Sequence, residues 1–62
     1  MTPDEIRRLR HNAGLTQERF ARELGISFAT VNRWENGRSA PSQLAQQRLR
    51  QFRKRTQRLQ AT

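Results

Sequence analysis

Arginine is the most abundant charged residue in this sequence, so most of its charged groups are guanidinium groups. Of its 62 residues, 13 are lysine or arginine and 12 of those are arginine, against five aspartate and glutamate residues, so the formal net charge is +8. The planar guanidinium fork matches phosphate oxygens and the edge of guanine better than the ammonium of lysine does. The composition therefore indicates an anionic partner, either a nucleic acid or an acidic surface.

The positive charge is concentrated near the C-terminal end. Residues 1–41 carry seven basic and five acidic side chains, whereas residues 42–62 carry six basic side chains and no acidic one. Four of these cations form a stripe opposite the apolar side of a helix predicted over about 43–58: Arg50, Arg53, Lys54 and Arg58. Because unbalanced cations repel one another, we expect the stripe to lie near a phosphate backbone or an acidic partner. The alternative is an ordinary solvated face.

Residue types that enzymes use are too few and too scattered to predict a catalytic or metal site. The chain has no cysteine, which excludes a disulfide framework, a thiolate zinc site and a cysteine nucleophile. Its only histidine, His11, has neither a partner nor a pocket in the pattern. The carboxylates show only helix-surface spacing, and no glycine-rich phosphate loop is present. We therefore expect no enzymatic activity, cofactor, metal ion or small-molecule substrate.

Two neighbouring polar side chains have the functional groups that read base edges. Asn32 can pair with adenine, and Arg33 can fork onto guanine in a major groove. Val31 and Trp34 mark the inward side of the same helix, so Asn32 and Arg33 fall on its outward side. The alternative is that both residues belong to a solvated face.

The outward side of this helix also includes Ser27, Phe28 and Ala29. Phe28 and Ala29 are apolar and could contact the methyl groups of thymine. The alternative for Phe28 is a place in the core, packed against the loop near Pro41.

Four helices are predicted to position these side chains. The run Thr2-Pro3-Asp4-Glu5 has the features of a capping box and begins a helix over about 3–13. Thr16 is the predicted cap of a helix over about 17–24, and Ser27 caps a third helix that ends at Asn36-Gly37. Ser42 caps the last helix, over about 43–58, whose apolar side is Leu44, Ala45, Leu49, Phe52 and Leu59.

The second and third helices together meet the requirements of a helix-turn-helix unit over 16–36. Two helices that cross steeply need a small residue at their contact, which Ala21 supplies, and a turn residue that accepts positive φ, which Gly25 supplies. Apolar anchors must seat both helices on one core, and the chain provides Phe20, Leu24, Ile26, Val31 and Trp34.

About residues 4–52 resemble the Cro/C1-type (XRE-family) helix-turn-helix domain of phage repressors and Cro proteins. The resemblance lies in Leu15-Thr16-Gln17, Ala21, Leu24-Gly25-Ile26-Ser27, Val31-Asn32-Arg33-Trp34-Glu35-Asn36-Gly37-Arg38 and Pro41. The chain departs from the family in two respects. Phe28 and Ala29 stand where many relatives carry polar base-reading residues, and the last helix is unusually rich in arginine.

The resemblance implies roles for residues outside the outward side of the third helix. Gln17 is expected to donate to a phosphate and to brace that helix, the alternative being an ordinary exposed residue. Asn36 and Arg38 lie where the family meets phosphate, although Arg38 could instead be an exposed loop charge. Arg10 and Glu35 are expected to form a partly buried salt bridge, a structural role.

The expected fold is all-α, a single lambda-repressor-like helix-turn-helix bundle of four to five helices over residues 1–62. The expected function is sequence-specific binding of duplex DNA by a cytoplasmic transcriptional regulator, a repressor that acts as a homodimer. One alternative is a DNA-binding antitoxin or a module of a longer protein. Others are a basic amphipathic helix that binds a membrane surface or an acidic protein, and an RNA-binding protein. No apolar run is long enough to span a bilayer.

Overall fold

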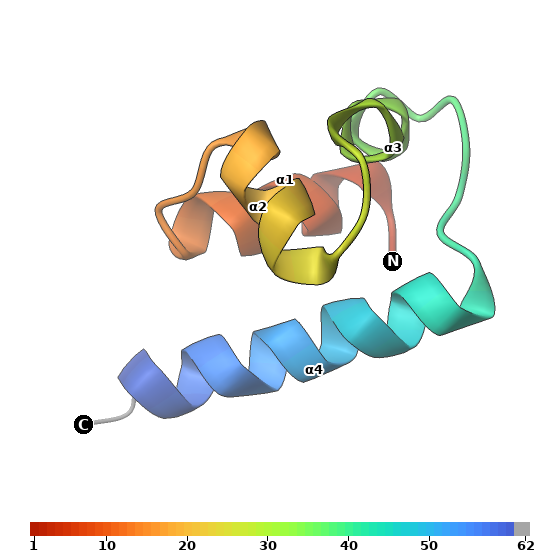
Figure 1. Cartoon of the computed structure of the whole chain (residues 1–62). Coiled ribbons are helices and arrows are strands. Elements are labelled where there is room, and N and C mark those ends of the chain that lie inside the picture. The colour runs from red at the N-terminus through yellow and green to blue at the C-terminus, as the bar shows by residue number, and fades with distance from the viewer. Residues whose placement is uncertain (61–62) are drawn as a thin grey trace.

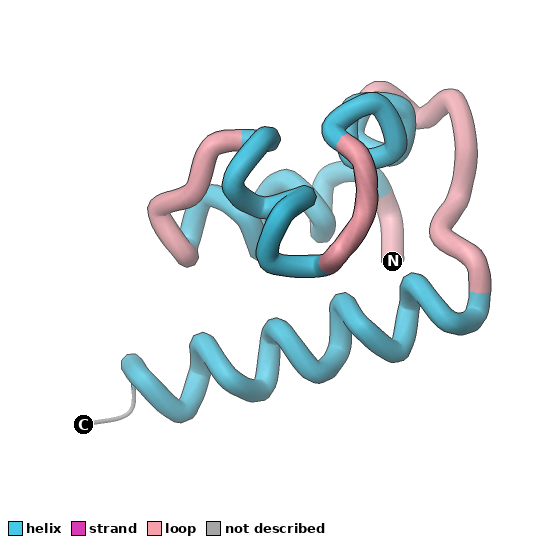
Figure 2. The backbone as a smooth tube through the Cα atoms, in the orientation of Figure 1, coloured by secondary structure: helices cyan, strands magenta, loops and turns pink. Residues whose placement is uncertain are grey.

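Four α-helices make up most of the computed structural model, which describes residues 1–60 (Figures 1 and 2). They are α1 (Pro3–Asn12), α2 (Gln17–Leu24), α3 (Phe28–Glu35) and α4 (Gln43–Gln60). No strand occurs within residues 1–60, so the predicted all-α class is confirmed, with four helices. The predicted side-chain positions of Arg58 and Leu59 lie outside the part of the chain whose side chains are described.

Side chains cap the start of each helix, as the sequence predicts. The Thr2 hydroxyl accepts a hydrogen bond from the backbone N–H of Glu5 over 3.1 Å, and the Glu5 carboxylate accepts one from the Thr2 N–H over 2.9 Å. This reciprocal capping box satisfies two N–H groups that the helix itself leaves unpaired. Single caps at the other three helices come from Thr16, Ser27 and Ser42.

The turn between α2 and α3 depends on a left-handed residue. Gly25 has φ +71°, a conformation that side chains with a Cβ rarely adopt, and it ends α2. The N–H of Ile26 then donates to the carbonyl of Ala21 over 2.9 Å, which closes the helix end. Ala21 itself is only 2% exposed, in agreement with its predicted place at the contact between α2 and α3.

One apolar core joins all four helices. Ile6, Phe20, Val31 and Leu49, one from each helix, are fully buried. The rings of Phe20 and Phe52 meet edge to face, with their centroids 5.3 Å apart, so α4 is held against α2. Figure 1 shows α1, α2 and α3 together on one side of the domain, with α4 running along the other side.

Leu44 is the exception to the predicted apolar side of α4. Leu44 is 60% exposed, whereas Ala45, Leu49 and Phe52 are buried as expected. Leu44 stands 100° from Ala45 around the helix, at the edge of the predicted apolar arc. The core ends before that edge, so the prediction that Leu44 packs inward is wrong.

Candidate nucleic-acid interface

The outward side of α3 forms an exposed surface at the edge of the domain (Figure 1). Phe28 is 48% exposed, and Ala29 and Arg33 are also exposed, whereas Val31 and Trp34 are buried on the opposite side of the helix. The sequence assigned these faces correctly. The alternative that Phe28 packs in the core is wrong.

Ser27 lies at the start of this surface, where its hydroxyl contacts Thr30. Its Oγ accepts a hydrogen bond from the backbone N–H of Thr30 over 3.2 Å and shares a second with the Thr30 hydroxyl over 2.8 Å. Ser27 therefore fixes the first turn of α3. A contact between this residue and DNA stays a prediction.

Arg10 and Glu35 form the salt bridge that the family resemblance implies. The Arg10 Nε donates to Glu35 Oε2 over 2.7 Å, and its Nη2 donates to Oε1 over 3.0 Å. The Nη1 of the same guanidinium donates to the carbonyl of Leu15 over 3.0 Å, so one side chain joins α1, the following loop and α3. Glu35 is only 3% exposed. Burial would raise the pKa of its carboxyl, but the hydrogen bonds from Arg10 and Gln17 outweigh this effect and hold the pKa below its usual value.

Gln17 joins the salt bridge to the outward side of α3. Its Nε2 donates to Glu35 Oε1 over 3.0 Å, and its Oε1 accepts from the Nδ2 of Asn32 over 3.3 Å. The half-buried Gln17 is therefore not an ordinary exposed helix residue. A hydrogen bond from Gln17 to phosphate stays a prediction. One hydrogen of its amide remains for that bond after these contacts.

Asn32 is held from both sides of its amide. Its Nδ2 donates to Gln17, and its Oδ1 accepts from the Nδ2 of Asn36 over 3.0 Å. An amide nitrogen carries two hydrogens and an amide oxygen two lone pairs, so one of each is left for a base edge. The orientation of the Asn32 amide is therefore set before any ligand binds. The chain of contacts Arg10–Glu35–Gln17–Asn32–Asn36 is referred to below as the polar chain.

The sequence predicted the members of the polar chain but not their connections. Asn32 and Asn36 are four residues apart on one helix, a spacing that could have indicated their contact. Gln17 and Glu35 are 18 positions apart, and only the folded arrangement of α2 and α3 brings them together.

Two arginines beside the outward side of α3 are exposed. Arg33 lies in the last turn of α3, and Arg38 follows in the loop, where its backbone N–H donates to the Arg33 carbonyl over 2.9 Å. Among the described residues, neither guanidinium pairs with a carboxylate. Both groups can therefore meet an external anion or base edge.

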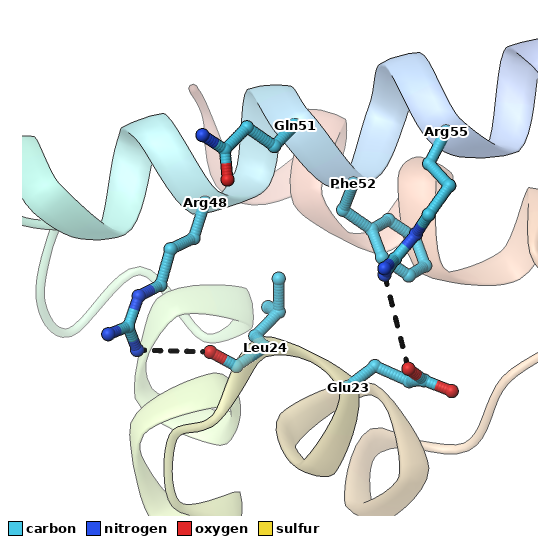
Figure 3. Close-up of a pocket in the computed structure, with 6 residues that line it drawn as sticks. All are labelled: Glu23, Leu24, Arg48, Gln51, Phe52 and Arg55. Atoms are coloured by element: carbon cyan, nitrogen blue, oxygen red, sulfur yellow. Dashed lines mark hydrogen bonds and ion pairs between the residues drawn. The ribbon is translucent and has the colours of Figure 1, made fainter.

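Two arginines of α4 contact residues at the C-terminal end of α2 (Figure 3). Arg48 reaches down from α4, and its Nη1 donates to the carbonyl of Leu24 over 3.1 Å. Arg55 lies over the Phe52 ring, 5.5 Å from its centroid, and its Nη2 is 4.0 Å from the carboxylate of Glu23. These contacts, which sequence reasoning missed, hold α4 to the helix-turn-helix unit.

The predicted stripe on α4 divides into residues with different surroundings. Arg50 and Lys54 are exposed, and among the described residues neither pairs with a carboxylate. Arg53 lies toward Glu5, whose pKa is lowered mainly by hydrogen bonds with Thr2 and to a smaller extent by Arg53. The Arg58 side chain lies outside the described part of the chain.

Within residues 1–60, no group of three or more histidine, cysteine, aspartate or glutamate side chains could hold a metal ion. None of the helices in that range is both long and apolar enough to cross a membrane.

Residues 6–51 match the sequence family described as helix-turn-helix. A 38-residue segment is 50% identical to the uncharacterized HTH-type transcriptional regulator YiaG of Escherichia coli K12. The same identity holds for the proteins of that name from E. coli O6:H1 and O157:H7. The match covers 61% of this chain but only 40% of each relative. No solved structure matches the chain significantly.

Proposed function

Since the chain belongs to the Cro/C1-type helix-turn-helix family, we propose that it is a transcriptional regulator that binds duplex DNA in a sequence-specific manner. The observation that carries the proposal is the exposed outward side of α3, on which the polar chain fixes the orientation of the Asn32 amide. A base-reading amide held in place loses less entropy on binding than a free one.

In the proposed complex, α3 enters the major groove with its outward side toward the bases. Arg33 forks onto guanine, and Asn32 pairs with adenine through its remaining hydrogen and lone pair. Phe28 and Ala29 contact thymine methyl groups, a readout by shape and apolar contact that compensates for the lack of polar groups there.

Phosphate contacts position this helix along the groove without reading the sequence. We assign them to residues that frame α3 and carry hydrogen-bond donors: Gln17, Ser27, Asn36 and Arg38. The exposure of Asn36 and Arg38 supports this assignment. Gln17 would then link a phosphate directly to the residue that orients Asn32.

The proposed biological role is repression by a cytoplasmic homodimer that occupies two half-sites about one helical turn apart. Most of the apolar side of α4 is used by the core of one chain, which leaves the loop over 36–42 and the neighbouring Leu44 for contact with a second copy. The 60% exposure of Leu44 supports this choice, because an exposed leucine beside a loop is apolar area available for burial.

Selection of bound sequences from random duplex DNA tests the proposal. We expect an enriched motif that contains a guanine and an adenine at neighbouring positions. If one chain makes about six phosphate contacts, the logarithm of the binding constant falls with the logarithm of salt concentration at a slope near −5. A slope shallower than about −2, together with no enriched motif, would exclude this mode of binding.

A further inference from the structure

The side of α4 that faces away from the core has a uniform chemistry. It is formed by exposed residues within one arc of the helix, which together are the outer face of α4: Gln43, Gln47, Arg50, Arg53, Lys54 and Gln57. Every member is an amide or a cation. The outer face itself therefore offers hydrogen-bond donors and positive charge. Glu5 of α1 lies toward Arg53 at one edge of the face, and the exposed Leu44 lies beyond its other edge.

The outer face of α4 and the outward side of α3 point in opposite directions. Val31 and Trp34 of α3 share one core with Leu49 and Phe52 of α4, so each helix turns its other side to solvent. Figure 1 shows α4 running below the first three helices, with α3 at the upper edge of the domain. The described chain measures 36 × 22 × 20 Å, so a partner on α3 and a partner on the outer face are separated by the thickness of the domain.

The cations of α4 that hold the fold together are not those at the centre of the outer face. Arg48 is used by the Leu24 carbonyl, and Arg55 by the Phe52 ring and Glu23. Arg50 and Lys54, one turn apart, pair with no carboxylate among the described residues. Like charges at this spacing repel each other, and an anion bound from outside would relieve the repulsion.

The chemistry of the outer face favours phosphate over a protein partner. Stable protein interfaces have an apolar and aromatic centre, which this face lacks. Contacts to the DNA backbone are made by arginine, lysine and glutamine side chains, which are the only types present here. We propose that the outer face of α4 binds the phosphate backbone of a second duplex, so that one domain bridges two DNA segments. This inference rests on the proposed function, in which α3 binds the first duplex.

A bead assay with two duplexes tests the bridge. One biotinylated duplex that carries the selected motif is immobilised, and a fluorescent duplex of unrelated sequence is added with the 62-residue chain at low salt. We expect recovery of the fluorescent duplex that depends on the protein and falls with salt at a slope near −3, from three phosphate contacts. The variant R50Q/K54Q should lower the recovery about three- to thirtyfold and flatten the slope toward −1.

A matched control removes the same amount of charge elsewhere. Arg8 and Arg22 are exposed on α1 and α2, outside both proposed contact surfaces, and neither pairs with a carboxylate among the described residues; R8Q/R22Q also lowers the net charge by two. This control should bridge like the parent. The variant R50K, which keeps the charge, should bridge as well. Circular dichroism checks that each variant is folded, and a titration with the motif duplex alone measures the contact of α3.

The outcomes separate the inference from the proposed function. Normal binding of the motif duplex by R50Q/K54Q, together with lost bridging, supports the inference. Bridging that R50Q/K54Q leaves intact overturns it, because the second duplex is then held by a second copy of α3. If the unsubstituted protein binds one duplex but bridges none, the inference is also overturned. An acidic protein is then the partner to test for the outer face. Failure to bind the motif duplex alone overturns the proposed function and the inference with it.

Discussion

Gln17 donates a hydrogen bond to the carboxylate of Glu35 over 3.0 Å, so the first residue of α2 is tied to the last residue of α3. The same Gln17 amide accepts from Asn32. A residue expected to contact phosphate is therefore also a support for a residue expected to read a base.

Replacement of Gln17 by alanine should affect both stability and specificity. The carboxylate of Glu35 loses one donor, which should lower the free energy of unfolding by about 1–3 kcal/mol. Asn32 loses the acceptor that orients it, so affinity for the motif duplex should fall more than affinity for a scrambled duplex. Titration of both duplexes measures the difference, with Glu18→Ala, at the next and exposed position, as the control. Equal losses on both duplexes would show that Gln17 acts through phosphate alone.

Acid should destabilise the fold through Glu35. Its pKa is lower in the folded chain than the value of about 4.3 for an unperturbed glutamate, so its carboxylate stabilises the folded state above that value. This contribution is lost as pH falls from about 4 through the lower folded pKa, and Glu5 contributes with the same sign. Urea unfolding at a series of pH values should show the decrease. A Glu35 carboxyl carbon that titrates above pH 4.3 by NMR would contradict this explanation.

Trp34→Ala should act through the fold, because Trp34 is 4% exposed on the inward side of α3. The cavity should cost about 3–5 kcal/mol. A domain of this size has about 3–9 kcal/mol in total, so circular dichroism should show a largely unfolded chain. Phe28→Ala is the matched variant on the same helix. It should stay folded and change only DNA binding, since Phe28 is 48% exposed.

The contrast between Trp34 and Phe28 shows what the sequence can predict. Helix limits, caps and the faces of α3 depend on residues within a few positions of one another, and the structure has them within two residues of the predicted limits. The exposure of Leu44 depends instead on where the core ends. The hydrogen bond from Arg48 to the Leu24 carbonyl joins residues 24 positions apart, and no local sequence pattern indicates it.

Arg33 and Arg38 should differ in how they affect specificity. Arg33→Ala should cost about 1–3 kcal/mol on the motif duplex and relax the preference at one base pair, because a guanine contact is lost. Arg38→Ala should weaken all duplexes to a similar degree and make the salt slope shallower by about 1. Measurement of each variant on motif and scrambled duplexes tests the pair of roles. Similar losses on both duplexes for Arg33→Ala would remove it from the base-reading residues.

Arg48→Ala should destabilise the attachment of α4 to α2. The carbonyl of Leu24 loses its donor, and the expected cost is about 1–3 kcal/mol in thermal or urea unfolding. Arg50→Ala removes an arginine two residues away that has no carboxylate partner among the described residues, and it should leave stability unchanged. An equal effect of the two substitutions would mean that the Arg48 contact contributes nothing specific.

The edge-to-face pair of Phe20 and Phe52 joins two helices that are far apart along the chain. Both loops that join α1, α2 and α3 are short, so we expect their contacts to close quickly, whereas the aromatic pair must close a segment of 32 residues. Fluorescence of Trp34, the single tryptophan, should therefore report an early docking of the first three helices. The core includes Leu49 and Phe52 of α4, so a ribosome must have released residues beyond Phe52 before the nascent domain can complete it.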